Sequence, residues 1–461
     1  MKPVMKDKPV MNEEQSTSKK KHFFLEQKWH LYLPIFLLGF SHIAAGETSE
    51  KEIQPVTDIF DDVGLTYDNP YQEKMLWGGN RKFIYQQDFA RVLSAPTGTA
   101  TNRSSLRFQW NKVAGQYYFN ADIKPIVYWN GDDSIDGDRS SDADFKIKEL
   151  YAKGSFGNTT VMVGDKIIVW GESDSTAVTD VISPQNITDL VFTSLDESRI
   201  SQTMLIVEHY VNSNQISLII NPDIEVDEQP LVAQGQGQTV ESRMDDKDAE
   251  IGINFKTVIG NGDFSLMFAD LTDNQGVDVL VKNPDTTITV SENFYKNYLM
   301  AGAAANLNFG DIALKLELAY NKDRAQELNP DMFDDQKYPY GYGISDEVLF
   351  AANIDYQENG VRDWSAGILH SRYESDRSSF VMDEGSYNEL FFGVTNKFMH
   401  ENLTVGINYQ HTVETKAAIS QLSLRYSFSD DLALQVDFFD LRKIGGTFNQ
   451  TSAITRLTYS F

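Results

Sequence analysis

Apolar and polar residues alternate along the last eleven residues of the chain, 451–461. One face carries Ala453, Thr455, Leu457, Tyr459 and Phe461, and the other face carries Ser452, Ile454, Arg456, Thr458 and Ser460. A period of two is typical of a β-strand with two unlike faces. The same alternation begins near Arg81 and recurs to the end of the chain, so the pattern predicts an all-β protein.

Short turns alternate with long polar loops between the predicted strands. The turns are rich in Gly, Asn and Asp, which is hairpin chemistry, and lie at 113–115, 260–262, 310–311, 358–360, 400–402 and 429–431. The long loops are 130–144, 171–201, 222–248, 272–295, 321–346 and 374–387. Counting back from Phe461, every short turn falls on the side where the chain ends. This predicts a transmembrane antiparallel β-barrel of about 18 strands (16–18), with short periplasmic turns and long extracellular loops. The strand number is given as a range because the apolar and polar residues at 81–94 and 145–170 alternate poorly.

The composition is compatible with a barrel and excludes several other classes. Of the 461 residues, 41% are hydrophobic and 23% are charged. After residue 46 no apolar run approaches the roughly 20 residues of a membrane helix, but in a barrel only alternate residues face lipid. The absence of cysteine excludes disulfides and thiolate metal sites. The net charge of -27 argues against nucleic acid as a partner.

The beginning of the chain has the features of an export signal. Three lysines at 19–21 precede an apolar stretch at 31–40, and small residues follow it. The next residues are acidic and have no period. The predicted organisation is a signal peptide at 1–46, an N-terminal periplasmic or lumenal segment at 47–80 and an outer-membrane β-barrel at 81–461.

The end of the last strand resembles the closing strand of Gram-negative outer-membrane β-barrels. The chain ends in Phe461, with Tyr459 two residues before it. In those barrels the terminal Phe is part of the assembly signal. The resemblance implies a location in the outer membrane, contact with its lipids and lipopolysaccharide, and recognition of Phe461 by the barrel-assembly machinery.

A second resemblance lies between residues 149 and 186. The chain reads Val163-Gly-Asp-Lys-Ile-Ile-Val-Trp-Gly-Glu-Ser-Asp174, with Glu149-Leu-Tyr before it and Asp180, Pro184 and Asn186 after it. This resembles a family of poorly characterised Gram-negative outer-membrane barrels, akin to porins and alginate-export channels. Its members carry Val-Gly-x-Gln, then Trp-Gly-Glu or Trp-Gly-Arg, then Asn-Pro-x-Asp. Here Lys166 stands in place of Gln, and Val178-Thr179 replaces Asn-Pro before Asp180.

The residues after this motif predict a loop with a role in the lumen. Gly171 permits a sharp turn off the strand, and Trp170 can anchor that turn at the barrel wall. Glu172, Asp174 and Asp180 then carry charge into a long loop, and such loops in compact folds are usually functional or disordered. One interpretation is a loop that folds inward and narrows the pore; the other is a latch that ties the loop to the wall.

The polar faces of several strands predict pore-lining residues. An Lys or Arg at the bilayer midplane costs about 2–4 kcal/mol, so the apolar faces must look at lipid and the opposite faces at the lumen. The residues on those opposite faces are Arg107, Lys124, Arg425, Asp437 and Arg456. The arginines either form a basic strip at the seam between the last strand and the first, with Asp437 paired to one of them, or only neutralise lumenal carboxylates.

No pattern in the chain indicates catalysis, a metal or a cofactor. His209, His370 and His411 lie in predicted strands without a Ser and Asp constellation. The acidic 130–144 loop lacks EF-hand spacing and is interpreted as solvated. The sequence therefore predicts a passive channel for small polar or charged solutes. An export channel for an acidic polysaccharide and a non-conducting surface or adhesion barrel are the alternatives.

Overall fold

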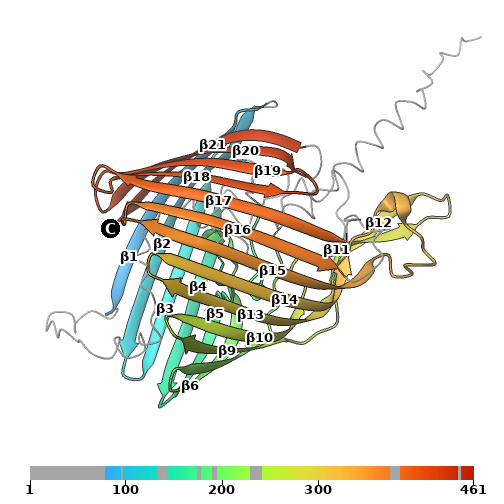
Figure 1. The fold of residues 1–461 in the computed structure, drawn as a ribbon, viewed down its shortest axis with the longest axis horizontal. Helices are drawn as coiled ribbons and strands as arrows, with labels where there is room; N and C mark the ends of the chain where they lie inside the picture. The colour runs from blue at the N-terminus through green and yellow to red at the C-terminus, as the bar shows by residue number, and fades with distance from the viewer. Residues whose placement is uncertain are drawn as a thin grey trace, which may run out of the picture.

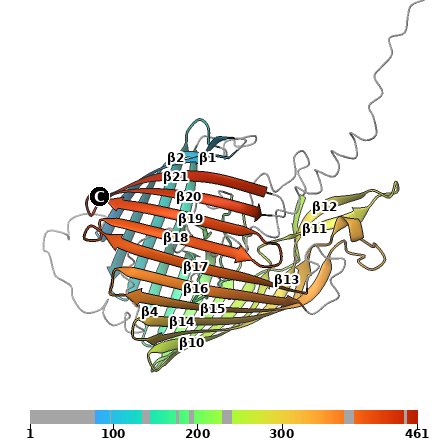
Figure 2. The ribbon, with the colours of Figure 1, turned by 45° about the horizontal axis from the view of Figure 1, so that its top comes forward.

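A closed antiparallel β-barrel of eighteen strands forms the body of the protein (Figures 1 and 2). The computed structural model describes residues 78–94, 97–132, 143–173, 178–188, 195–228, 241–373, 385–444 and 448–461. The predicted signal peptide and most of the segment 47–80 lie outside these residues. The predicted fold of about 18 strands is confirmed, and the poorly alternating regions 81–94 and 145–170 do contain strands.

The barrel strands follow one another around the wall in chain order, and each pairs antiparallel with its two neighbours. They are β1 (Asn80–Val92), β2 (Gly98–Ala114), β3 (Tyr117–Tyr128), β4 (Ala143–Phe156), β5 (Thr159–Lys166), β6 (Gln202–Val211), β7 (Asn214–Asn221), β9 (Glu250–Ile259), β10 (Gly262–Thr272), β13 (Asn297–Phe309), β14 (Ile312–Gln326), β15 (Gly343–Glu358), β16 (Arg362–Tyr373), β17 (Ser386–Phe398), β18 (Leu403–Thr412), β19 (Ala418–Ser427), β20 (Leu432–Ile444) and β21 (Phe448–Ser460).

Most of the remaining structure lies on the side of the barrel opposite the C-terminus. A three-stranded sheet projects there, made of β8 (Glu241–Met244), β11 (Val277–Lys282) and β12 (Ile288–Tyr295). The only described helices are α5 (Leu195–Ser198) and the 3₁₀ turn η4 (Pro330–Met332). The loop predicted at 321–346 is shorter than expected, because β14 and β15 extend into it.

None of the described helices has the length and hydropathy needed to span a membrane.

The two faces of the wall differ as the alternation predicts, with one exception. On β10 the outward Leu266 and Phe268 are exposed, and the inward Met267 is fully buried. The inward residues of β16 to β19 are mostly polar, as in Ser371 and Gln410. A patch of the inward face between β5 and β13 is instead apolar and rich in methionine, with Met162, Met204, Ile206, Met267 and Met300. An apolar inner face needs a cover, and the loop described below provides it.

The barrel closes where β21 pairs with β1, in register from Ile84 opposite Ser460 to Val92 opposite Ser452. Phe461 extends this pairing, since it exchanges two backbone hydrogen bonds with Phe83, both of 2.9 Å. The Phe461 ring stacks on the rings of Phe83 and Tyr459, with centroids 5.5 and 5.6 Å apart. The terminal residue is therefore part of the closing seam.

Deletion of Phe461 should lower the fraction of folded protein. It removes two hydrogen bonds, each contributing about 0.5–1.5 kcal/mol, and two aromatic contacts of about the same size. The measurement is the fraction of heat-modifiable, folded protein in membrane fractions. Phe428→Ala is the control, because Phe428 is about equally exposed (58% against 60%) and its ring contacts that of Tyr426, away from the closing seam. A folded fraction as high as that of the control would contradict a role for Phe461 in closure.

Candidate functional site

The chain between β5 and β6 enters the barrel and lies against the inner wall. We call its described residues 167–173, 178–188 and 195–201 the lumenal loop. Trp170, which is 5% exposed, packs into the methionine-rich inner face together with Ile182. Gly252 on β9 makes room for the ring, since a Cβ there would lie 2.7 Å from it. Trp170 thus lies against the wall, as the sequence predicts.

A single carboxylate on β14 holds one end of the lumenal loop, at residues 172–173 and 178–179. Glu317 Oε1 accepts hydrogen bonds from the backbone N–H groups of Glu172 (2.7 Å) and Ser173 (2.6 Å). Its Oε2 accepts from the N–H groups of Val178 (2.7 Å) and Thr179 (3.0 Å) and from the Thr179 hydroxyl (2.9 Å). Glu317 is 1% exposed. Hydrogen bonds to a charged group are about twice as strong as neutral ones, so this carboxylate is a strong anchor.

Two further contacts shape the same end of the loop. Val178 packs against the inner faces of β14 to β17, including Leu369 and Tyr387. Gly302 on β13 lets Thr179 approach, since a Cβ there would lie 3.1 Å from the threonine methyl group. The loop therefore reaches the wall formed by β14 to β17.

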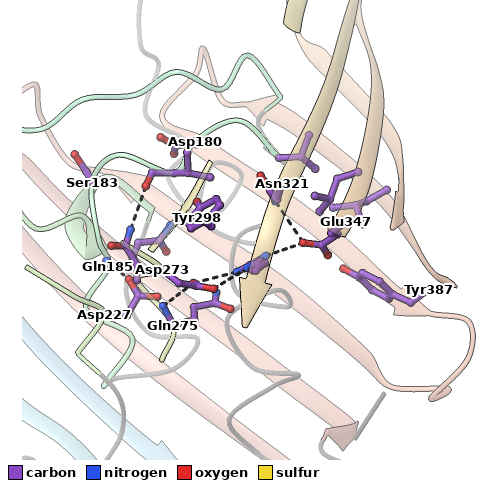
Figure 3. Close-up of a pocket in the computed structure, with 16 residues that line it drawn as sticks. Asp180, Ser183, Gln185, Asp227, Asp273, Gln275, Tyr298, Asn321, Glu347 and Tyr387 are labelled. Atoms are coloured by element: carbon purple, nitrogen blue, oxygen red, sulfur yellow. Dashed lines mark hydrogen bonds and ion pairs between the residues drawn. The ribbon is translucent and has the colours of Figure 1, made fainter. Parts of the chain in front are cut away.

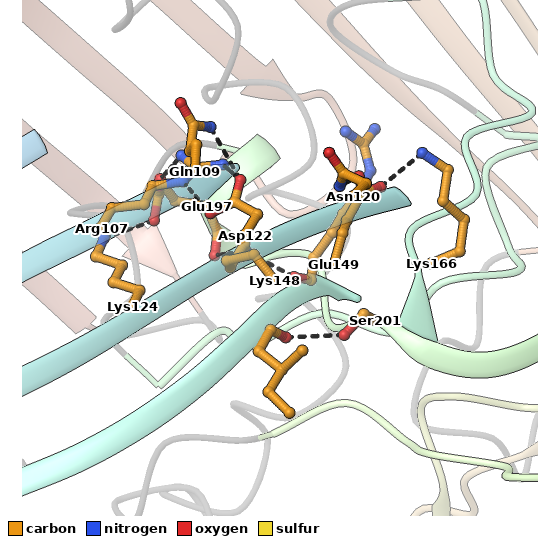
Figure 4. Close-up of polar contacts among 12 residues, drawn as sticks. Arg107, Gln109, Asn120, Asp122, Lys124, Lys148, Glu149, Lys166, Glu197 and Ser201 are labelled. Atoms are coloured by element: carbon orange, nitrogen blue, oxygen red, sulfur yellow. Dashed lines mark hydrogen bonds and ion pairs between the residues drawn. The ribbon is translucent and has the colours of Figure 1, made fainter. Parts of the chain in front are cut away.

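The other end of the lumenal loop is anchored on β2, β3 and β4 (Figure 4). Glu197 accepts from Arg107 (2.9 Å) and Lys124 (2.7 Å), and Lys148 donates to the Glu197 and Arg199 carbonyl oxygens, both at 2.9 Å. Burial alone would raise the pKa of Glu197, but Lys124, Arg107 and Lys148 together hold it well below its ordinary value. Glu197 therefore remains charged, so ion pairs fix this end of the loop, and hydrogen bonds to the Glu317 carboxylate fix the other.

The remaining residues of the predicted loop site have separate contacts. Asp180 forms a buried ion pair of 2.6 Å with Arg199, which joins the two legs of the loop. The Glu172 side chain pairs with Lys256 on β9 at 3.1 Å. Asp174 lies outside the described residues.

Gly171, where the sequence predicts a sharp turn off the strand, does not have a positive φ. The glycine of this motif with a positive φ is Gly164 (132°), where a Cβ would lie 2.3 Å from the Leu150 carbonyl oxygen. The neighbouring Lys166 pairs with Glu149 at 2.7 Å and lies over the Tyr151 ring, so these three motif residues form one cluster.

A pocket of about 630 Å³ lies beside the loop, against β21 and the first four strands. We call it the basic pocket. Its charged lining residues are five cations and two carboxylates: Arg103, Lys124, Lys146, Lys148, Arg456, Asp88 and Glu197. Lys146 makes no ion pair with any residue that the structure describes. The lining therefore carries a net positive charge.

Strand register places charged and polar groups side by side across the closing seam. Arg425, Gln435, Arg456, Asp88 and Arg103 lie directly opposite one another on β19, β20, β21, β1 and β2. We call this the seam row. Arg425 forms no ion pair within the described part of the chain.

Two details of the predicted basic strip need correction. Arg107 lies opposite Ile84, four residues nearer the C-terminal side than the seam row, and Arg103 takes the expected place. Among the described residues, Asp437 pairs with no arginine and accepts hydrogen bonds from Gln435 and Gln421. The reason is register: Asp88 lies directly opposite Arg456 and pairs with it at 2.9 Å, whereas Asp437 lies opposite Ile454.

The histidines of the predicted strands have ordinary contacts. His209 contacts Thr159, His370 contacts Asn388, and His411 contacts the Ala417 carbonyl oxygen. The described residues hold no group of three His, Cys, Asp or Glu side chains arranged to bind a metal ion.

Comparison with known proteins identifies the fold and a family. The family described as "Protein of unknown function (DUF1302)" matches residues 99–346, which is more than half of the chain. No curated protein matches the chain. None of these findings tests the likeness to alginate-export channels, which stays a prediction.

Several solved structures share the fold at low sequence identity. OpdK of Pseudomonas aeruginosa with vanillate is 11% identical, over 83% of this chain and 98% of that chain, with a TM-score of 0.51. OccK2 (OpdF) of the same organism with glucuronate has the same identity and coverage and a TM-score of 0.53. A BenF-like porin from Pseudomonas fluorescens Pf-5 is 10% identical over the same shares, with a TM-score of 0.53. At this identity the similarity shows the fold alone.

Substitution of Glu317 by Gln should release the lumenal loop from β14. The amide offers one oxygen where the carboxylate offers two, and its NH₂ group would face N–H donors. Each lost hydrogen bond to a charged group is worth about 1.5–3 kcal/mol. We expect new protease cleavage between residues 167 and 201 and a higher single-channel conductance in planar bilayers.

Glu401→Gln is the control, because Glu401 is exposed in the turn between β17 and β18. It makes the same chemical change without touching the loop. If Glu317→Gln leaves both cleavage and conductance at the level of this control, Glu317 does not hold the loop in place.

Proposed function

The chain belongs to the DUF1302 family, whose function is unknown, and we propose that it is a porin-like channel of the outer membrane that passes small anionic solutes by diffusion. Three parts of the lumen carry this proposal: the basic pocket, the seam row and the lumenal loop. The basic pocket is the decisive one, because it sets the sign of the charge that a solute meets.

The basic pocket can attract anions even though the net charge of the whole protein is negative. The whole chain carries a net charge of -27, but exposed charges more than about 8 Å away are largely screened in physiological salt. In a narrow pore the nearest fixed charges dominate selectivity. Five cations against two carboxylates at the pocket wall therefore favour anions locally. Pairing reduces this excess but leaves Lys146 without an ion pair among the described residues, and Arg425, which belongs to the seam row and not to the pocket, also has none.

The ligands of two solved barrels of similar fold support the same class of solute. OpdK was crystallised with vanillate and OccK2 with glucuronate, and both ligands are carboxylates. Because the sequence identity is 11%, the ligands of these two proteins support a proposal about the present chain and do not show what it binds.

The lumenal loop would set the width of the pathway. It is anchored to Glu317 on one wall and to Arg107, Lys124 and Lys148 on another, so it occupies space inside the barrel. The latch and the narrowing loop, which were alternatives in the sequence, are then two aspects of one segment. Transport needs no chemical step, because solutes diffuse past fixed charges.

The partners follow from the same proposal. Outer-membrane lipids and lipopolysaccharide would contact the exposed apolar face of the wall, and the barrel-assembly machinery would read Phe461. No described feature favours polysaccharide export or an adhesion role over diffusion of small solutes.

Removing the unpaired cations should shift ion selectivity. We expect the double variant Lys146→Gln with Arg425→Gln to move the reversal potential under a salt gradient toward cation preference. Neither residue forms an ion pair with a described side chain, so both changes alter lumenal charge without leaving a carboxylate unpaired.

Lys416→Gln serves as the control, since Lys416 is exposed in the turn after β18. A reversal potential in the double variant equal to that of the control would rule out an anion-selective wall. A purified, folded barrel that conducts no current would instead favour the non-conducting alternative.

A further inference from the structure

A second pocket, of about 840 Å³, lies between the lumenal loop and the wall formed by β13 to β17 (Figure 3). We call it the acidic pocket. It shares no lining residue with the basic pocket. In Figure 3, Gln185, Asp227 and Asp273 gather on one side, and Glu347 and Tyr387 lie on the other.

Carboxylates outnumber cations around the acidic pocket. Arg324 pairs with Asp273 at 2.7 Å and with Glu347 at 2.9 Å, so one guanidinium serves two carboxylates. Asp180, a third carboxylate of the lining, already has its own cation in Arg199, which is not a lining residue. The fourth carboxylate, Asp227, makes no ion pair with a described residue.

Asp227 is the group whose charge the pocket leaves uncompensated. It is 9% exposed and accepts a 2.7 Å hydrogen bond from the Gln185 N–H. Burial raises the pKa of Asp227 to about 7, even though the Gln185 hydrogen bond favours the charged form. A bound cation would supply the counter-charge that the protein does not.

Two buried oxygen atoms in the lining also lack donors. Asp180 Oδ1 and Asn321 Oδ1 have no hydrogen-bond partner among the described residues, although the two side chains are 8% and 2% exposed. Both atoms have almost no accessible surface, so they add to the negative potential at the pocket wall but are not open to a ligand.

Part of the lining is apolar or aromatic. Leu349, Leu369 and Tyr387 belong to one packed cluster at the pocket wall. A bare metal ion gains no binding energy from an apolar surface. The described residues also include no group of side chains arranged to bind a metal ion. An organic cation has a body that can pack there, and aromatic faces attract ammonium groups.

We infer that the acidic pocket binds a small organic ammonium ion. Its N–H groups donate to Asp227, and its apolar body lies against Leu349, Leu369 and Tyr387. This goes beyond the proposed function, which concerns anions at a different wall.

Calorimetric titration of the purified, folded full chain with benzylammonium chloride tests the inference at pH 8, where Asp227 is ionised. Benzyl alcohol has the same ring without the charge, and benzoate carries the opposite charge. We expect benzylammonium to bind at least tenfold more tightly than either. Equal binding of benzyl alcohol, tighter binding of benzoate, or no binding of benzylammonium would each overturn the assignment.

A matched pair of variants locates the bound cation. Asp227→Asn keeps an oxygen acceptor for the Gln185 N–H and should weaken benzylammonium binding at least tenfold. Asp223→Asn removes the same charge four residues away, at an exposed position of the same loop, and should leave binding unchanged. Equal losses in both variants would overturn the site, because they would indicate general surface charge. If Asp227→Asn does not fold, the ligand series on the unmodified protein still decides.

Discussion

The arrangement of the lumen depends on one carboxylate that faces inward from the wall. Glu317 presents two oxygens to four backbone N–H groups and one hydroxyl of the lumenal loop. A backbone segment inside a barrel has no sheet neighbour, so its N–H groups need acceptors from elsewhere. Glu317 supplies acceptors for the N–H groups at 172–173 and 178–179. At the other end of the loop, Glu197 contacts three cations, Arg107, Lys124 and Lys148. Both pockets are bounded by the loop on one side and by the barrel wall on the other.

The barrel was predictable because its alternation is a local property of each strand. Inward and outward faces, short turns and the closing strand can all be read within about ten residues. The wall from β5 to β13 also contains a usable signal: β10 and β13 are apolar on both faces, as in Phe264-Ser-Leu-Met-Phe268. An apolar inner face indicates an internal cover, and this could have predicted where the loop lies.

The site was predictable only in part, because its contacts join residues far apart in the chain. Glu317 lies 145 residues from Glu172, and nothing in the alternating strand around it distinguishes it from other inward polar residues. Glycine within a strand usually weakens it, and the sequence alone gives no reason for Gly252 and Gly302. The reason is that side chains of the lumenal loop pack against them. The pairing of Arg456 with Asp88 instead of Asp437 follows from register, which the pattern of one strand does not fix.

The seam row has a consequence for how the protein is made. It runs across the junction of the last strand with the first, and its ion pair joins Arg456 to Asp88, which are 368 residues apart in sequence. An intermediate with every hairpin formed but the seam open would have these two charges unpaired and on separate edges. In the proposed channel, the charge pattern that would discriminate between ions is therefore complete only once the seam has closed. Ion selectivity would then report on whether the barrel is closed.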